Sequence, residues 1–121
     1  MSGKRTILVV EDDGLVRDFI VDELKEAGYR VLEAENGEAA LAVAANEKFD
    51  VLFTDIRLPG SVDGWKLAQT VREARPEVAI VYSTGYVPSR EMQLHGTRFL
   101  MKPYRPPEVL RAIEELLESS E

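Results

Sequence analysis

The sequence predicts an α/β protein built on a doubly wound parallel sheet. Five short runs of apolar or alternating residues predict strands, at Thr6–Val10, Tyr29–Glu33, Val51–Thr54, Val78–Tyr82 and Thr97–Met101. A segment with helical spacing of apolar residues follows each of them. Parallel strands need crossover connections, so this alternation predicts helices on both faces of the sheet. A length of 121 residues suits one such domain.

The first helix is expected from Asp13 to a stop at Gly28. Its apolar residues recur at helical spacing and predict a core-facing stripe of Leu15, Val16, Phe19, Ile20 and Leu24. Four further helices are expected at 38–45, at about 64–74, around 89–94 and from the Pro106-Pro107 pair onward. The third should bury Trp65 or Leu67, Ala68 and Val71, and the last carries a stripe of Val109, Leu110, Ile113, Leu116 and Leu117. The strand at 29–33 alternates and is expected at a sheet edge.

Composition excludes several classes of function. The net charge of −7 argues against a nucleic-acid partner or an anionic membrane partner, both of which need a basic face. With no cysteine and a single histidine, disulfides and common zinc sites are not expected. No apolar stretch reaches the length of a membrane span, and we expect a cytoplasmic protein.

Chemically reactive side chains follow four of the predicted strands. The carboxyl ends of parallel strands meet at one edge of the sheet, where ligands of such folds bind. That edge should gather Glu11, Asp12, Asp13, Asp55, Ser83, Thr84 and Lys102. Two carboxylates about 4 Å apart repel by roughly 4 kcal/mol at an effective dielectric of 20. Such a group must therefore take up a proton, keep its carboxylates apart or hold a cation.

A cluster of hard carboxylate oxygens favours Mg²⁺ over transition metals. An aspartate beside such an ion can act as a nucleophile toward a phosphoryl donor, and we expect Asp55 to do so. Thr84 and Lys102 would then contact the other phosphoryl oxygens. Taken singly, each residue has a structural explanation: Asp13 as a helix N-cap, Asp55 and Thr84 as turn residues, and Lys102 as a solvated lysine.

Other functions of this fold class fit the same residues less well. A flavin or dinucleotide site needs a glycine- or hydroxyl-rich loop after the first strand, where Glu11-Asp-Asp13 would repel phosphate. The P-loop pattern is absent. A metal-dependent phosphatase with an aspartyl nucleophile would need a general acid two residues after Asp55, and Arg57 occupies that position. A protein-interaction module that is never phosphorylated remains the alternative from another class.

Four segments together resemble the receiver domain of two-component response regulators, from about residue 5 to 118. They are Ile7-Leu-Val-Val-Glu-Asp-Asp13, Thr54-Asp-Ile-Arg-Leu-Pro-Gly60 with Asp63-Gly64, Ser83-Thr-Gly85 and Phe99-Leu-Met-Lys-Pro103. The resemblance implies a flavodoxin-like (βα)5 fold with strand order 2-1-3-4-5. We expect a single receiver domain over residues 1–121 with no output domain, acting as a signalling module and not as a turnover enzyme. A receiver cut from a larger hybrid kinase or transcription factor is equally compatible with the sequence.

The resemblance also assigns roles by position. Asp55 resembles the phosphoacceptor, Asp12 a direct Mg²⁺ ligand, Glu11 a ligand through water, and the Arg57 carbonyl a further ligand. Thr84 resembles the switch hydroxyl, Lys102 the phosphate-pairing lysine, Phe99 the switch aromatic, and Pro103 a proline after a cis peptide bond. Phosphorylation is expected to switch the face around the fourth and fifth strands and the last helix.

The implied partners are a sensor histidine kinase or histidine phosphotransfer protein and an unknown downstream protein. The chain would be a monomer or a phosphorylation-dependent homodimer.

Three departures from the family pattern are visible. The loop Pro59-Gly-Ser-Val-Asp-Gly64 is one residue longer than the commonest version, and the stretch between Gly85 and Phe99 is short. Arg57 and Tyr86 lie two residues beyond Asp55 and Thr84, where the family tunes the lifetime of the phosphoryl group. Because both side chains are bulky, we expect slow dephosphorylation.

Overall fold

A parallel sheet runs through the centre of the structure, a computed structural model that describes residues 4–85 and 96–119. Its five strands are β1 (Thr6–Val10), β2 (Arg30–Ala34), β3 (Val51–Asp55), β4 (Ala79–Thr84) and β5 (Thr97–Met101). The described helices are α1 (Gly14–Glu26), α2 (Gly37–Asn46), α3 (Gly64–Ala74) and α4 (Pro106–Ser119). None of these helices is both long enough and apolar enough to cross a membrane.

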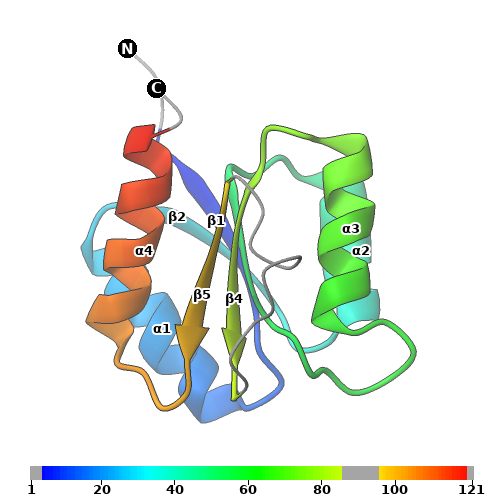
Figure 1. The fold of residues 1–121 in the computed structure, drawn as a ribbon, viewed down its shortest axis with the longest axis horizontal. Coiled ribbons are helices and arrows are strands. Elements are labelled where there is room, and N and C mark those ends of the chain that lie inside the picture. Colours follow the sequence, from blue (N-terminus) through cyan, green and yellow to red (C-terminus); the bar gives the residue numbers. More distant parts are fainter. Residues whose placement is uncertain (1–3, 86–95, 120–121) are drawn as a thin grey trace.

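The strands lie in the order β2-β1-β3-β4-β5, and all the pairs are parallel. Helices α1 and α4 cover one face of the sheet, and α2 and α3 cover the other (Figure 1). This arrangement confirms the predicted flavodoxin-like fold, its strand order and the position of β2 at an edge. It also brings the ends of β1 and β3 side by side at the centre of the sheet, with β4 next to them.

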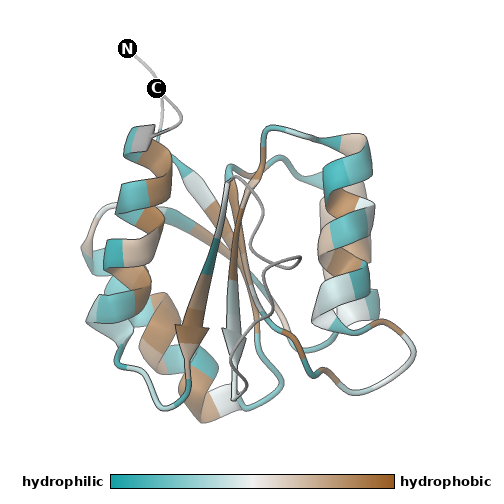
Figure 2. Ribbon diagram, viewed as in Figure 1, coloured by the Kyte–Doolittle hydropathy of each residue, from teal (hydrophilic) through white to brown (hydrophobic). Residues whose placement is uncertain are grey.

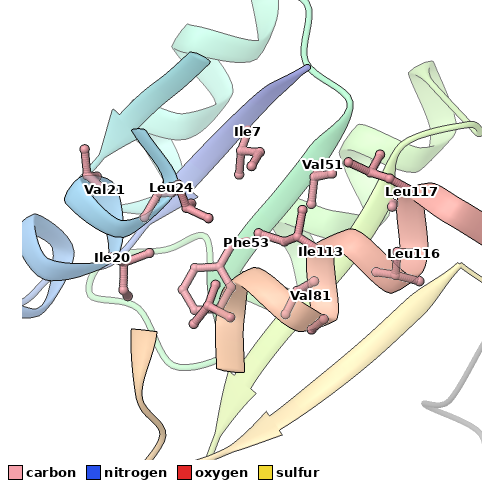
Figure 3. Close-up of a cluster of buried hydrophobic side chains, with 14 residues drawn as sticks. Ile7, Ile20, Val21, Leu24, Val51, Phe53, Val81, Ile113, Leu116 and Leu117 are labelled. Atoms are coloured by element: carbon pink, nitrogen blue, oxygen red, sulfur yellow. The ribbon is translucent and has the colours of Figure 1, made fainter. Parts of the chain in front are cut away.

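Two apolar clusters hold the layers together, one on each face of the sheet. In Figure 2 the hydrophobic positions concentrate in the strands and on the sides of the helices that face them. Side chains alternate between the faces along each strand. In β3, for example, Val51 and Phe53 join the α1–α4 cluster, whereas Leu52 joins the α2–α3 cluster. Figure 3 shows Phe53 and Val81 packing with Ile113 of α4 in the first cluster.

An acidic or amide side chain caps the start of three helices. Asp13 accepts hydrogen bonds from the N–H groups of Leu15 and Val16 at 3.0 and 3.2 Å, which confirms its predicted capping role. Asp63 accepts one from Lys66 at 2.7 Å, and Asn36 one from Ala39 at 2.7 Å. Such caps contribute typically about 1 kcal/mol each. The caps at positions 13 and 63 fix the loops that follow β1 and β3.

Several sequence expectations need correction. The predicted stripe of α1 is wrong at two positions, because Leu15 and Phe19 are 67% and 59% exposed while Val21 is buried. The helix therefore faces the core with Ile20, Val21 and Leu24. Strand boundaries move by one or two residues at β2, β3 and β4. The short helix predicted around 89–94 lies outside the described residues.

Candidate functional site

The carboxyl ends of β1 and β3 bring three acidic side chains together. Asp55 is the last residue of β3, and Glu11 and Asp12 directly follow β1, its hydrogen-bonded neighbour. Ligand oxygens of the three carboxylates lie within 4.8 Å of one another. Glu11 and Asp55 are buried, at 4% and 5% exposure, and Asp12 is exposed. The structure thus assembles the acidic group that the sequence predicted.

Lys102 reaches into this acidic group from the end of β5. Its Nζ lies 2.6 Å from Oδ2 of Asp55, close enough for a charge-assisted hydrogen bond. The N–H of Lys102 donates to the carbonyl oxygen of Thr84 at 2.8 Å, which ties the ends of β4 and β5 together. The peptide bond between Lys102 and Pro103 is cis, as expected. The N–H of Arg57 donates to Oδ1 of Asp55 at 3.3 Å, so both oxygens of that carboxylate have partners.

Glu11 has the most perturbed electrostatics of the acidic group. The pKa of its carboxyl is raised to about 7, chiefly by burial. The N–H of Asp13 and the charge of Lys102 oppose this rise, and the neighbouring Asp12 and Asp55 add to it. The N–H of Asp13 lies 3.1 Å from Oε2 of Glu11. A cation at this place would favour the ionised form of all three acids. The donor set, made only of hard oxygens, fits Mg²⁺.

Thr84 ends the strand next to Asp55, and Phe99 lies further back in the sheet, in register with Tyr82. Thr84 is buried at the last position of β4, and its neighbour Ser83 is in register with Asp55. Phe99 in β5 stacks on Tyr82 with 5.0 Å between ring centroids, and Tyr82 stacks on Trp65 of α3 at 5.3 Å. We call Phe99, Tyr82 and Trp65 the aromatic row. It connects the β5 strand to the single tryptophan of the chain.

A cavity of about 630 Å³ opens above the acidic group. It is lined by Glu11, Asp12, Asp13, Val16, Asp55, Lys102, Pro103 and Tyr104. Helical spacing placed Val16 in the apolar stripe of the first helix, and the sequence did not single out Tyr104. The available signal for Tyr104 was its position directly after the Lys102-Pro103 pair, which the sheet topology carries to the same edge as Asp55.

Two sequence predictions about this site stay predictions. The side chain of Arg57 is exposed next to Asp55, and the assignment of its carbonyl oxygen as a metal ligand has no direct observation behind it. Tyr86, the other residue expected to tune phosphoryl lifetime, lies outside the described part of the chain.

The fold and the acidic pocket define a flavodoxin-like α/β domain with a carboxylate site at the carboxyl edge of its sheet. The sequence profile of the response regulator receiver domain matches residues 7–114. The chain belongs to this family, the receiver domains of two-component systems, which are signalling modules.

Relatives and solved structures agree with this assignment. The response regulator receiver protein CpdR of Brucella abortus is 33% identical over 118 residues, which are 93% of this chain and 97% of that protein. A CheY-like receiver domain from Methanospirillum hungatei has a TM-score of 0.87 at 30% identity, covering 98% of this chain and 97% of that one. Other relatives are longer, and the chain spans 53% of one and 13% of another.

A third match bears on the acidic pocket. The response regulator TrrA of Thermotoga maritima, solved in complex with Mg²⁺ and BeF, has a TM-score of 0.79 at 29% identity and covers 93% of this chain and 98% of its own.

Proposed function

We propose that Asp55 accepts a phosphoryl group from the phosphohistidine of a sensor histidine kinase or of a histidine phosphotransfer protein. The observation that carries this proposal is the buried carboxylate of Asp55, held at the end of β3 between Lys102 and two further acids. One carboxylate oxygen forms a bond to phosphorus while the phosphorus–nitrogen bond of the donor breaks. The imidazole nitrogen keeps the electron pair and takes up a proton.

The residues around Asp55 would have different functions in this transfer. Lys102 would move from its contact with Oδ2 to a phosphoryl oxygen, keeping its charge next to the negative charge that arrives. Asp12 and Asp55, with Glu11 through water and the carbonyl of Arg57, would hold Mg²⁺. When bound, this ion neutralises charge on the phosphoryl oxygens. The buried position of Asp55 keeps bulk water away from its carboxylate.

The aromatic row offers a route from phosphorylation to the protein surface. A phosphoryl group adds charge and acceptor oxygens beside Thr84, whose hydroxyl would move toward it. Phe99 would repack into the space that Thr84 leaves. Because Phe99 stacks on Tyr82 and Tyr82 on Trp65, this movement alters the environment of the tryptophan.

The test is a titration with beryllium fluoride in the presence of Mg²⁺, followed by Trp65 fluorescence. We expect a saturable change in the wild-type protein and none in D55N. F99L should still bind the phosphoryl mimic, detected by calorimetry, but show a smaller fluorescence change. An equal fluorescence change in D55N would refute the assignment of Asp55.

We further propose that Arg57 and Tyr86 slow the hydrolysis of the phosphoryl group by hindering the attacking water. The N–H of Arg57 contacts the Asp55 carboxylate, so the exposed side chain of the same residue is attached close to the phosphorylation site. The R57A/Y86A variant should therefore lose its phosphoryl group faster than the wild type. A phosphoryl half-life in the wild type no longer than in this variant would rule out the brake.

A further inference from the structure

Three buried polar side chains, one of them Asp55, form a layer at the edge of the apolar core. Side chains two residues apart on a strand share a face of the sheet. Val9, Phe53 and Val81 belong to the core cluster between the sheet and α1 with α4. The residues two positions later are Glu11, Asp55 and Ser83, so the two carboxyls and the hydroxyl continue the same face. All three are buried.

Tyr104 covers this polar layer. Its ring packs edge-on against Phe53, with 6.0 Å between centroids and an interplanar angle of 82°. It also packs against the apolar core cluster of that face and lines the acidic cavity together with Glu11 and Asp55. Burial raises the pKa of Tyr104, the charges of Glu11 and Asp55 raise it further, and the hydroxyl of Ser83 lowers it. The hydroxyl of Tyr104 is itself buried, and the residue lines the same cavity as Glu11 and Asp55.

The hydroxyls of Ser83 and Tyr104 are both buried and neighbour each other, but neither makes a hydrogen bond of good geometry among the described residues. Leaving a buried hydroxyl unsatisfied costs about 1–3 kcal/mol. Buried water typically satisfies such groups, and it needs two to four polar partners to stay bound. The two hydroxyls and the carboxylate of Glu11 supply three partners on one face of the sheet.

We propose that Ser83 and Tyr104 hold one ordered water molecule against Glu11, which makes Tyr104 a positioning residue of the cation site. Each hydroxyl donates its proton to the water oxygen, and the water donates a proton to the Glu11 carboxylate. This holds the ionised carboxylate in place for Mg²⁺. Groups behind the ligands typically change metal affinity about 10–100-fold when they are removed. The inference rests on the Mg²⁺ site proposed above.

The experiment measures Mg²⁺ affinity by isothermal titration calorimetry of the full chain and of Y104F. This substitution keeps the ring on Phe53 and removes only the hydroxyl. We expect Mg²⁺ to bind about tenfold more weakly to Y104F. Phosphorylation by acetyl phosphate should need a correspondingly higher Mg²⁺ concentration but reach the wild-type rate at saturation. The melting temperature without Mg²⁺ shows whether each variant folds.

Two further variants separate this role from general packing. S83A should weaken Mg²⁺ binding by a similar factor, and S83A/Y104F should bind no more weakly than either single variant, because both hydroxyls hold the same water. Y82F removes the hydroxyl of a buried tyrosine on the opposite face and should leave Mg²⁺ affinity unchanged.

If folded Y104F binds Mg²⁺ as tightly as the wild type, the role of Tyr104 is wrong, but the cation site itself still stands. The same holds if the losses of Mg²⁺ affinity in S83A and Y104F add up in the double variant. Absence of Mg²⁺ binding by the wild-type protein overturns the cation site itself.

Discussion

At the scale of single residues, Glu11 links the acidic pocket to the stability of the whole domain. The pKa of its carboxyl is raised from an ordinary value of 4.5 to about 7. Burial is the main cause, and the nearby acids add to it. In the unfolded chain this carboxyl ionises near its ordinary pKa. The folded protein therefore holds a proton that the unfolded chain has lost throughout the interval between these two values.

The sign of the resulting pH dependence follows. A raised carboxyl pKa contributes stability that is fully present below about pH 4.5 and is lost as the pH rises through about 7. We expect the stability of the metal-free wild type to decline relative to E11Q across this interval, measured as the midpoint of urea unfolding. Mg²⁺ should reduce the decline because it binds the ionised form. A constant difference between the two proteins from pH 4.5 to 7 would contradict this prediction.

The sequence predicted the charged residues of the site but not its buried tyrosine. Glu11, Asp12, Asp55 and Lys102 were predictable because strand ends of a parallel sheet converge, and the structure brings all four together. The hydroxyl of Tyr104 was not predictable. An aromatic residue after a proline is compatible with simple packing, and only the three-dimensional arrangement shows that its hydroxyl is buried and that it shares a cavity with the acids.

At the scale of elements, the start of α3 packs against the backbone of the phosphoacceptor. A Cβ added to Gly64 would lie 1.9 Å from the carbonyl oxygen of Asp55. The N–H of Gly64 also donates to the carbonyl oxygen of Ile56 at 2.8 Å. The first residue of α3 must therefore be small, because the loop after β3 folds back onto the end of the strand.

We expect G64A to destabilise the protein by about 1–3 kcal/mol, the range for forcing extra volume into a packed site. It should also slow phosphorylation, because Asp55 must shift. The matched control is G14A, which changes the first residue of α1, where an added Cβ meets only Arg17 Nη2 at 3.7 Å. That variant should be as stable as the wild type or up to about 1 kcal/mol more stable. Equal stability of G64A and G14A in urea unfolding would show that the close approach does not matter.

Helix α1 shows where the prediction of elements from the sequence failed. Its apolar residues cover more of the helix circumference than the core contacts, so spacing alone could not select the buried side. Leu15 and Phe19 remain exposed, whereas their neighbour Val16 lines the acidic cavity.

At the scale of the whole molecule, the sheet topology explains why residues far apart in the sequence act at one place. Glu11 and Lys102 follow strands separated by most of the chain, and the order β2-β1-β3-β4-β5 places their strand ends at one edge around Asp55. The alternation of strands and helices predicted the fold class, and the family resemblance supplied the strand order.

The most direct test of the central claim is the intact mass of the protein after incubation with Mg²⁺ and acetyl phosphate. The wild type should gain the mass of one phosphoryl group, and chelation of Mg²⁺ before the reaction should prevent the gain. The D55N variant, folded as judged by thermal melting, should gain nothing. A gain that persists in D55N would contradict the assignment of Asp55, and no gain in the wild type would favour a protein-interaction module that is never phosphorylated.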